Sequence, residues 1–148
     1  MKLALIILFL VFFSYALGVW FNKERANQLS QKPSSIYQPD CDLNKQPCQV
    51  EDGDFKYVLS FNGEPSALKP FTVELAVESP ELDQVDVNFE MEGMDMGYNR
   101  YQLREINNTW QADVILPVCS VGRNDWILNL ELNAKGRLHL AKFHFNQP

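Results

Sequence analysis

The chain has 148 residues, enough for one ordinary domain and an additional tail or anchor. Its 19 acidic and 13 basic side chains give a formal net charge of −6, which argues against nucleic acid as a partner because nucleic acid needs basic patches. The sequence also lacks the Gly-x-Ser-x-Gly, His-Glu-x-x-His, phosphate-loop and Cys-x-x-Cys motifs of common enzymes, so we expect no catalytic activity.

The first apolar segment, residues 3–21, is long enough to cross a bilayer. A helix of this length would reach about 28 Å, close to the thickness of the hydrocarbon layer. We therefore predict that residues 1–22 form a transmembrane anchor and that the rest of the chain is exported. A cleaved signal peptide is the alternative, because residues 16–18 offer the small side chains of a cleavage site. Continuation of the apolar run through Trp20 and Phe21 favours the anchor.

Residues 23–54 are polar and rich in turn-forming residues, which predicts a linker without regular structure. Cys41 and Cys48 lie in this range, and their spacing predicts a small disulfide loop in an oxidising compartment. A redox-active or metal-binding dithiol is the alternative for this pair.

From residue 55 the apolar side chains follow a period of two, which is typical of half-buried strands. The expected strands are 55–61, 71–77, 85–91, 98–106, 110–116, 126–132 and 137–146. This many short strands predict that residues 55–148 form an all-β domain, an immunoglobulin-like β-sandwich of about seven strands.

The apolar pattern changes parity within the last expected strand, from Leu138 and Leu140 to Phe143 and Phe145, which predicts a β-bulge. The two histidines, His139 and His144, lie in this strand, and the bulge would bring both to the solvent side. The alternative is that one of them is an additional metal ligand.

Three of the four methionines, Met91, Met94 and Met96, fall within six residues that also contain Gly93. The thioether of methionine is a soft ligand suited to Cu(I), although methionine also fills gaps in cores. Met91 is in phase with the apolar face of its strand and is therefore expected in the core. Met94 and Met96 follow Gly93 and are free of that register.

Cys119 is the odd cysteine, in the connection of residues 117–125 after an expected strand. A free cysteine is most often a small buried side chain, but an unpaired thiol in an exported protein is also a candidate ligand. If this connection and the methionine loop lie at one end of the sandwich, then Met94, Met96 and Cys119 would offer an all-sulfur Cu(I) site, with Met91 as a further candidate.

The methionine loop at residues 89–99, followed by Trp110, by residues 119–122 and by Trp126, resembles the YtkA-like and FixH-like family of bacterial exported domains. The resemblance covers about residues 55–145. It implies a small, membrane-anchored sandwich linked to copper handling and to the assembly of haem–copper oxidases.

Together these patterns favour a membrane-tethered periplasmic protein that binds or delivers Cu(I) and that partners a membrane oxidase or its assembly factors. The alternative is a structural or assembly protein that binds a membrane partner through its sandwich surface without metal. A redox role for the three cysteines is a more distant hypothesis.

Overall fold

The protein is described by a computed structural model that covers residues 36–94 and 96–147. The predicted anchor at residues 1–22 lies outside the described residues. Over those two ranges, no helix has the length and apolar character needed to cross a bilayer.

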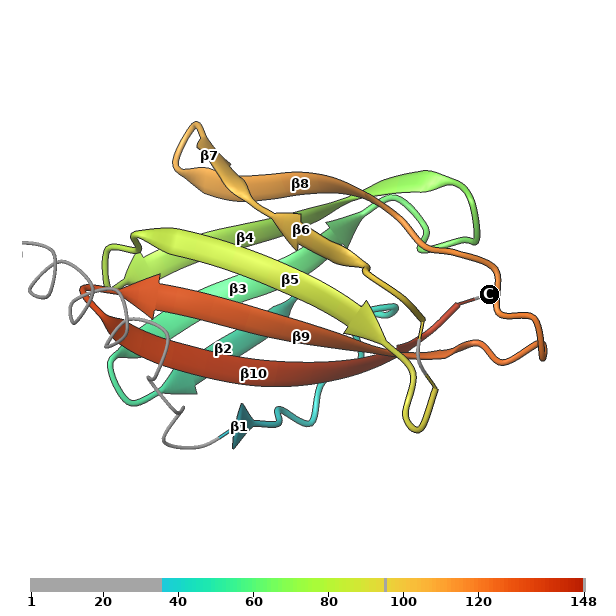
Figure 1. The fold of residues 1–148 in the computed structure, drawn as a ribbon. Helices are drawn as coiled ribbons and strands as arrows, with labels where there is room; N and C mark the ends of the chain where they lie inside the picture. Colours follow the sequence, from blue (N-terminus) through green and yellow to red (C-terminus); the bar gives the residue numbers. More distant parts are fainter. Residues whose placement is uncertain (1–35, 95, 148) are drawn as a thin grey trace, which may run out of the picture. The chain divides into compact units, whose positions relative to one another are not determined.

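The described chain is all-β, as predicted, and its strands form two sheets (Figure 1). One five-stranded sheet has the order β1-β10-β9-β5-β6, and the other has the order β2-β3-β4-β8-β7. The strands are β1 (Ile36–Tyr37), β2 (Cys48–Asp52), β3 (Phe55–Asn62), β4 (Pro70–Ser79), β5 (Gln84–Glu90), β6 (Arg100–Gln102), β7 (Arg104–Ile106), β8 (Thr109–Ile115), β9 (Asp125–Ala134) and β10 (Arg137–Asn146).

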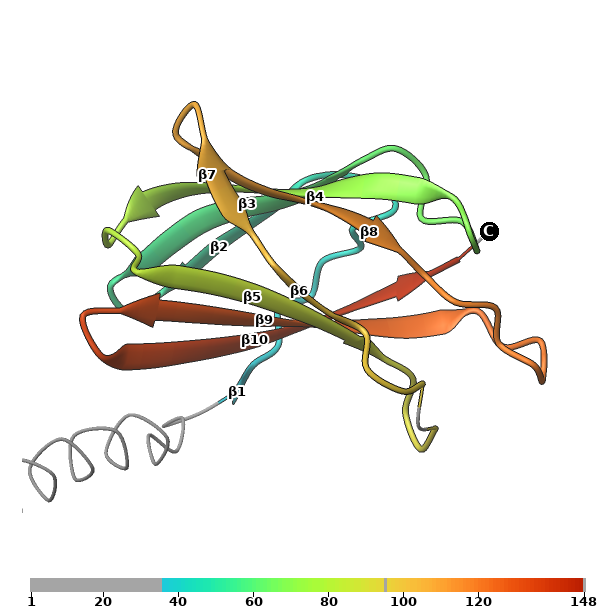
Figure 2. The ribbon, with the colours of Figure 1, turned by 45° about the horizontal axis from the view of Figure 1, so that its top comes forward.

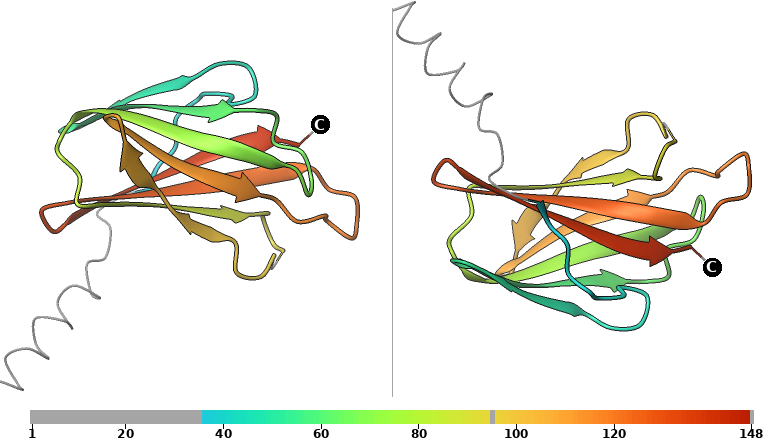
Figure 3. Two further views of the ribbon diagram at one scale, coloured as in Figure 1. Left: turned by 90° about the horizontal axis from the view of Figure 1, so that it is seen from above. Right: turned by 90° about the horizontal axis from the view of Figure 1, so that it is seen from below.

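The two sheets pack face to face, with the core between them (Figure 3). Alternate side chains of each long strand point inward, because successive residues of a strand face opposite sides of the sheet. Rings from the two sheets meet in the core: Phe61 of β3 lies 5.1 Å from Phe145 of β10, and Phe71 of β4 lies 6.2 Å from Phe89 of β5, between ring centroids. Six strands were expected between residue 55 and residue 132. The period-two prediction is confirmed for all of them except 98–106.

The expected strand 98–106 is divided between the two sheets. β6 pairs with β5 in one sheet, and β7 pairs with β8 in the other. Leu103 stands between them with its side chain buried and donates its backbone N–H to Val85. Figure 2 shows this segment passing from one sheet to the other along one side of the sandwich.

The expected linker of residues 23–54 contains two short strands that were not predicted, at residues 36–37 and 48–52. β1 pairs in parallel with β10, and β2 pairs with β3. The disulfide between Cys41 and Cys48 is confirmed, with the two Cα atoms 5.9 Å apart. Cys48 is fully buried at the start of β2, so the disulfide attaches the preceding loop to the core.

The predicted bulge in the last strand is also wrong. β10 pairs with β9 without interruption from Arg137 to Asn146, and the inward side chains keep one parity that begins with His139. Leu140 therefore points outward, where it pairs with Ile36 of β1 and is half-buried. The sequence pattern misled because it assigned a polar histidine to solvent, whereas His139 has hydrogen-bonding partners inside the sandwich.

Candidate metal centre

The methionine loop and the connection that carries Cys119 lie at the same end of the sandwich. The loop follows β5, and the connection of residues 116–124 precedes β9, which is the strand paired with β5. Figure 2 shows the two segments at the same end of the sandwich, beyond the ends of these strands. The expectation that the topology brings them together is confirmed.

One contact between the two segments joins two sulfur atoms. The thiol of Cys119 donates to the thioether of Met94, with Sγ and Sδ 3.6 Å apart. Cys119 is a free cysteine with 7% of its surface exposed, whereas Met94 is half-buried. Sulfur is a weak donor and a weak acceptor, so this contact contributes little stability on its own.

The other two methionines flank this contact. Met91 has 2% of its surface exposed, which confirms that it belongs to the core. A tight turn holds Met91 and Met94 together, since the backbone N–H of Met94 donates to the carbonyl of Met91 over 3.1 Å. Met96 is half-buried and packs against the core.

Arg123 ties the two segments together by hydrogen bonds. Its Nη1 donates to the backbone carbonyl of Glu92 in the methionine loop over 2.9 Å, and its Nε donates to Asp125 over 2.8 Å. The hydrogen bonds from Arg123 lower the pKa of Asp125 to about 2, so this ion pair persists at mildly acidic pH. The guanidinium also adds positive charge beside the segment that contains Cys119.

A surface pocket of about 540 Å³ opens beside the methionines. Met91 and Met94 line it together with His144 of β10 and an ion pair between Lys142 and Glu90, whose Nζ and Oε1 atoms are 3.3 Å apart. His144 is exposed, as expected, and stands at the rim of the methionine site. Sequence reasoning had not assigned it to this loop, although the pairing of β5, β9 and β10 places Glu90, Ile127 and His144 in one row.

Harder ligands do not gather into a metal site in the described part of the chain. Within residues 36–94 and 96–147, no three side chains of histidine, cysteine, aspartate or glutamate are placed to hold a metal ion. A metal centre at this end would therefore depend on methionine sulfur, which suits Cu(I) and not a hard cation.

Comparisons with known proteins do not identify the chain. No protein-family model matches it, and no curated protein matches it. Among solved structures, it is similar to the crystal structure of an engineered protein, with 14% sequence identity and a TM-score of 0.47, over 71% of this chain and 21% of the other. The chain thus spans about a fifth of that protein's length, and a similarity at this level carries no argument about function. The YtkA-like and FixH-like resemblance stays a prediction from the residues.

His139, another residue of a type that often binds metals, is also buried, and its ring contacts neighbouring polar and aromatic side chains. Its Nε2 lies 3.2 Å from the hydroxyl of Tyr57, its Nδ1 lies 3.4 Å from a carboxylate oxygen of Asp52, and its ring stacks on Phe55 with centroids 4.6 Å apart. Burial lowers the pKa of His139, and Asp52 opposes this shift. Burial likewise raises the pKa of Tyr57, with smaller contributions from Tyr37 and Asp52. Sequence reasoning missed this cluster, which forms where β10 of one sheet packs against β2 and β3 of the other.

Proposed function

We propose that this protein is a membrane-tethered, periplasmic copper protein that holds Cu(I) between its methionine loop and the 116–124 connection. Met94 and Cys119 supply two sulfur ligands, and Met96 or Met91 supplies a third. The protein would deliver the ion to a membrane partner, such as a respiratory oxidase or one of its assembly factors. The observation that carries the proposal is the 3.6 Å contact between Cys119 Sγ and Met94 Sδ.

The chemistry of this end suits a monovalent soft ion. A thiolate and two thioethers are soft ligands, which favour Cu(I) over the hard divalent cations. The thiolate carries one negative charge, which balances the charge of Cu(I), and the thioethers are neutral.

The strand order supports the finer part of the fold proposal, an immunoglobulin-like sandwich. In that fold the strands lie as A-B-E-D in one sheet and as C-F-G in the other. Here β3-β4-β8-β7 occupy the first set of places and β5-β9-β10 the second, with β6 beside β5. The apolar segment at residues 3–21 supports an N-terminal transmembrane helix that tethers this sandwich.

Anaerobic Cu(I) titration of the purified full chain, in competition with a chromogenic chelator, tests the proposal. We expect one equivalent of Cu(I) to bind and the double substitution Met94→Leu with Cys119→Ala to abolish tight binding. Met91→Leu and Met96→Leu, taken singly, identify the third sulfur, because only loss of a ligand lowers the affinity. Affinity should rise with pH, since Cys119 must lose a proton to ligate. If the double variant binds Cu(I) as tightly as the original chain, the copper proposal is wrong.

A metal-free assembly role is the second candidate, and one observation favours it. Tyr98 is 90% exposed, and Val118 and Val121 are also exposed, in the same two segments that carry the sulfur atoms. Such side chains suit contact with a partner protein. This candidate replaces the first if substitutions at Tyr98 and Val121 abolish partner binding while removal of copper leaves it unchanged.

A further inference from the structure

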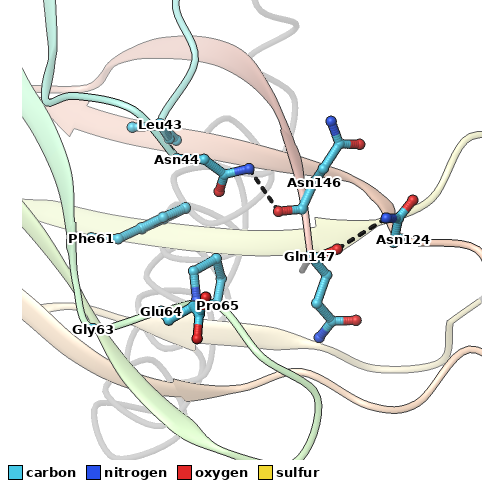
Figure 4. Close-up of a pocket in the computed structure, with 9 residues that line it drawn as sticks. All are labelled: Leu43, Asn44, Phe61, Gly63, Glu64, Pro65, Asn124, Asn146 and Gln147. Atoms are coloured by element: carbon cyan, nitrogen blue, oxygen red, sulfur yellow. Dashed lines mark hydrogen bonds between the residues drawn. The ribbon is translucent and has the colours of Figure 1, made fainter.

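A second pocket, with a volume of about 520 Å³, shares no residue with the methionine site. It lies where β3 and β10 end, and the disulfide loop covers one side of it (Figure 4). Its lining consists of Leu43, Asn44, Phe61, Gly63, Glu64, Pro65, Asn124, Asn146 and Gln147. The volume falls within the range of about 300–1,000 Å³ that is usual for small-molecule sites.

Gln147 leaves a buried donor without a partner in this pocket wall. The side chain has only 6% of its surface exposed, and its Oε1 accepts from Trp126 Nε1 over 3.4 Å. Since Trp126 can only donate, the opposite end of the carboxamide must be the Nε2 donor. That nitrogen has no hydrogen-bond partner among the described residues. A buried donor of this kind favours a ligand that brings an acceptor.

Acceptors dominate the rest of the polar lining. Asn44 donates from Nδ2 to the carbonyl of Asn146 over 2.7 Å, so its Oδ1 is left as an acceptor. Figure 4 shows that oxygen directed toward Phe61. Glu64 is exposed and adds a carboxylate. Among the described residues, the lining contains no lysine, arginine or histidine, which disfavours an anionic ligand.

The apolar part of the lining is held in place by the core. Phe61 is half-buried, and its ring packs edge to face against Phe71 and Phe145, with centroids 5.2 Å and 5.1 Å away. Pro65 lies beside it in the pocket (Figure 4). Together they offer a rigid apolar surface to one face of a ligand.

We propose that this pocket binds a neutral, hydroxyl-bearing sugar ring. Each hydroxyl can both donate and accept, so one ring can donate to Asn44 Oδ1 and Glu64. It can accept from the buried Gln147 Nε2 once the carboxamide turns toward the pocket. The C–H face of the ring packs on Phe61 and Pro65. An organic ammonium ion would satisfy Glu64 and the ring of Phe61 but would leave the donor of Gln147 unpaired, so the sugar fits better.

The disulfide has a definite role in this proposal. Leu43 and Asn44 belong to the loop that the Cys41–Cys48 bond closes, and they form one wall of the pocket. Closing the loop fixes Asn44 before the ligand arrives, which lowers the entropy cost of binding.

Saturation-transfer NMR and calorimetry of the full chain test the proposal, in a polyoxyethylene detergent that carries no sugar headgroup. The probes are methyl glucoside, methyl galactoside, methyl mannoside, N-acetylglucosamine and cellobiose, with choline and butylammonium as the competing class. We expect at least one sugar to bind with a dissociation constant on the order of millimolar, as a ligand of this size allows.

Two substitutions place the binding in this pocket. Gln147→Met and Glu64→Gln should each weaken sugar binding by about threefold to tenfold, the usual effect of one neutral hydrogen bond. Glu81→Gln is the matched control, because Glu81 is exposed and does not line the pocket. Reduction of the disulfide should also weaken binding, and Met94→Leu should leave it unchanged, which separates this proposal from the copper site. The proposal is overturned if no sugar binds, if only the ammonium probes bind, or if Gln147→Met and Glu64→Gln both leave sugar affinity unchanged.

Discussion

His139 and Cys119 are both buried, and both are residues that often bind metals, yet their surroundings differ. Each ring nitrogen of His139 faces a polar partner, Tyr57 or Asp52, on strands of the opposite sheet. Cys119 instead contacts the sulfur of Met94, and both lie in connections between strands. The hydrogen bond with Tyr57 and the contact with Asp52 explain the burial of His139 as part of the fold. The thiol–thioether contact of Cys119 is weaker than a hydrogen bond of that kind. The stability that this contact adds therefore does not by itself explain why two soft ligands lie side by side.

This difference suggests how to distinguish side chains that are buried to stabilise the fold from side chains that are buried to bind a ligand. A buried polar group whose partners are satisfied stabilises the core, and its removal should cost stability. A buried group whose polar contact is only with another candidate metal ligand should cost less stability when it is replaced by a side chain of similar volume, and should affect metal binding instead. The predictions below test this separation in order of expected effect.

The largest expected effect is on the stability of the His139 cluster. His139→Leu should lower the free energy of unfolding by about 2 kcal/mol, because the hydroxyl of buried Tyr57 loses its partner. Adding Tyr57→Phe to that variant should restore part of the loss, since both polar groups are then gone. Urea unfolding of the two single variants and the double variant measures the coupling. A coupling energy of zero would mean that the hydrogen bond does not stabilise the protein.

A pH effect of the same cluster comes next. Burial lowers the folded-state pKa of His139 below its ordinary value of 6.5, so the unfolded chain binds the proton more readily between those two values. This contribution to stability is complete above pH of about 6.5 and is lost as the pH falls through that value toward the lowered pKa.

Thermal unfolding between pH 5 and pH 8 measures this effect. The original chain and a His144→Gln variant should show the same loss toward acid, because His144 is exposed. A His139→Gln variant should show a weaker pH dependence over the same interval. An equal slope in all three proteins would assign the acid sensitivity to other groups.

The smallest expected effect on stability is at the sulfur contact. Met94→Leu keeps the volume of a half-buried side chain and should change the free energy of unfolding by less than about 1.5 kcal/mol. Urea unfolding of the copper-free protein measures it, with Met91→Leu as the matched variant in the core. A loss as large as that of His139→Leu would mean that Met94 serves packing, contrary to the comparison.

The strand pattern was largely predictable from the sequence, because apolar side chains at every second position fix which face of a strand is buried. β2 was missed because its alternation rests on Cys48 and Val50 alone, within a polar segment. A signal was present, since Gly53-Asp54, which forms the turn between β2 and β3, is a common hairpin pair, and Gly53 has a φ of 59°. The division of the expected strand 98–106 at Leu103 could not be predicted from the apolar pattern of that segment alone. It depends on the strands with which the two halves pair, which are β5 for β6 and β8 for β7.

The candidate site was predictable only in part. The sandwich topology indicated that Met94 and Cys119 would meet, and their two segments do lie together. The place of His139 was not predictable, since hydropathy assigns histidine to the surface and the partners Tyr57 and Asp52 come from distant strands. The orphaned donor of Gln147 likewise depends on a fold-level contact with Trp126.

The short strands at the edges of the two sheets affect how copies of the protein interact when they are crowded together. β1, β6 and β7 contain 2, 3 and 3 residues, and β2 contributes the remaining border with 5 residues that include Glu51 and Asp52. An open border of this length presents few free backbone groups to another copy, and charged side chains further discourage pairing. Many copies crowded on one surface should therefore resist joining edge to edge into fibrils, although strands are the regular structure of the described residues.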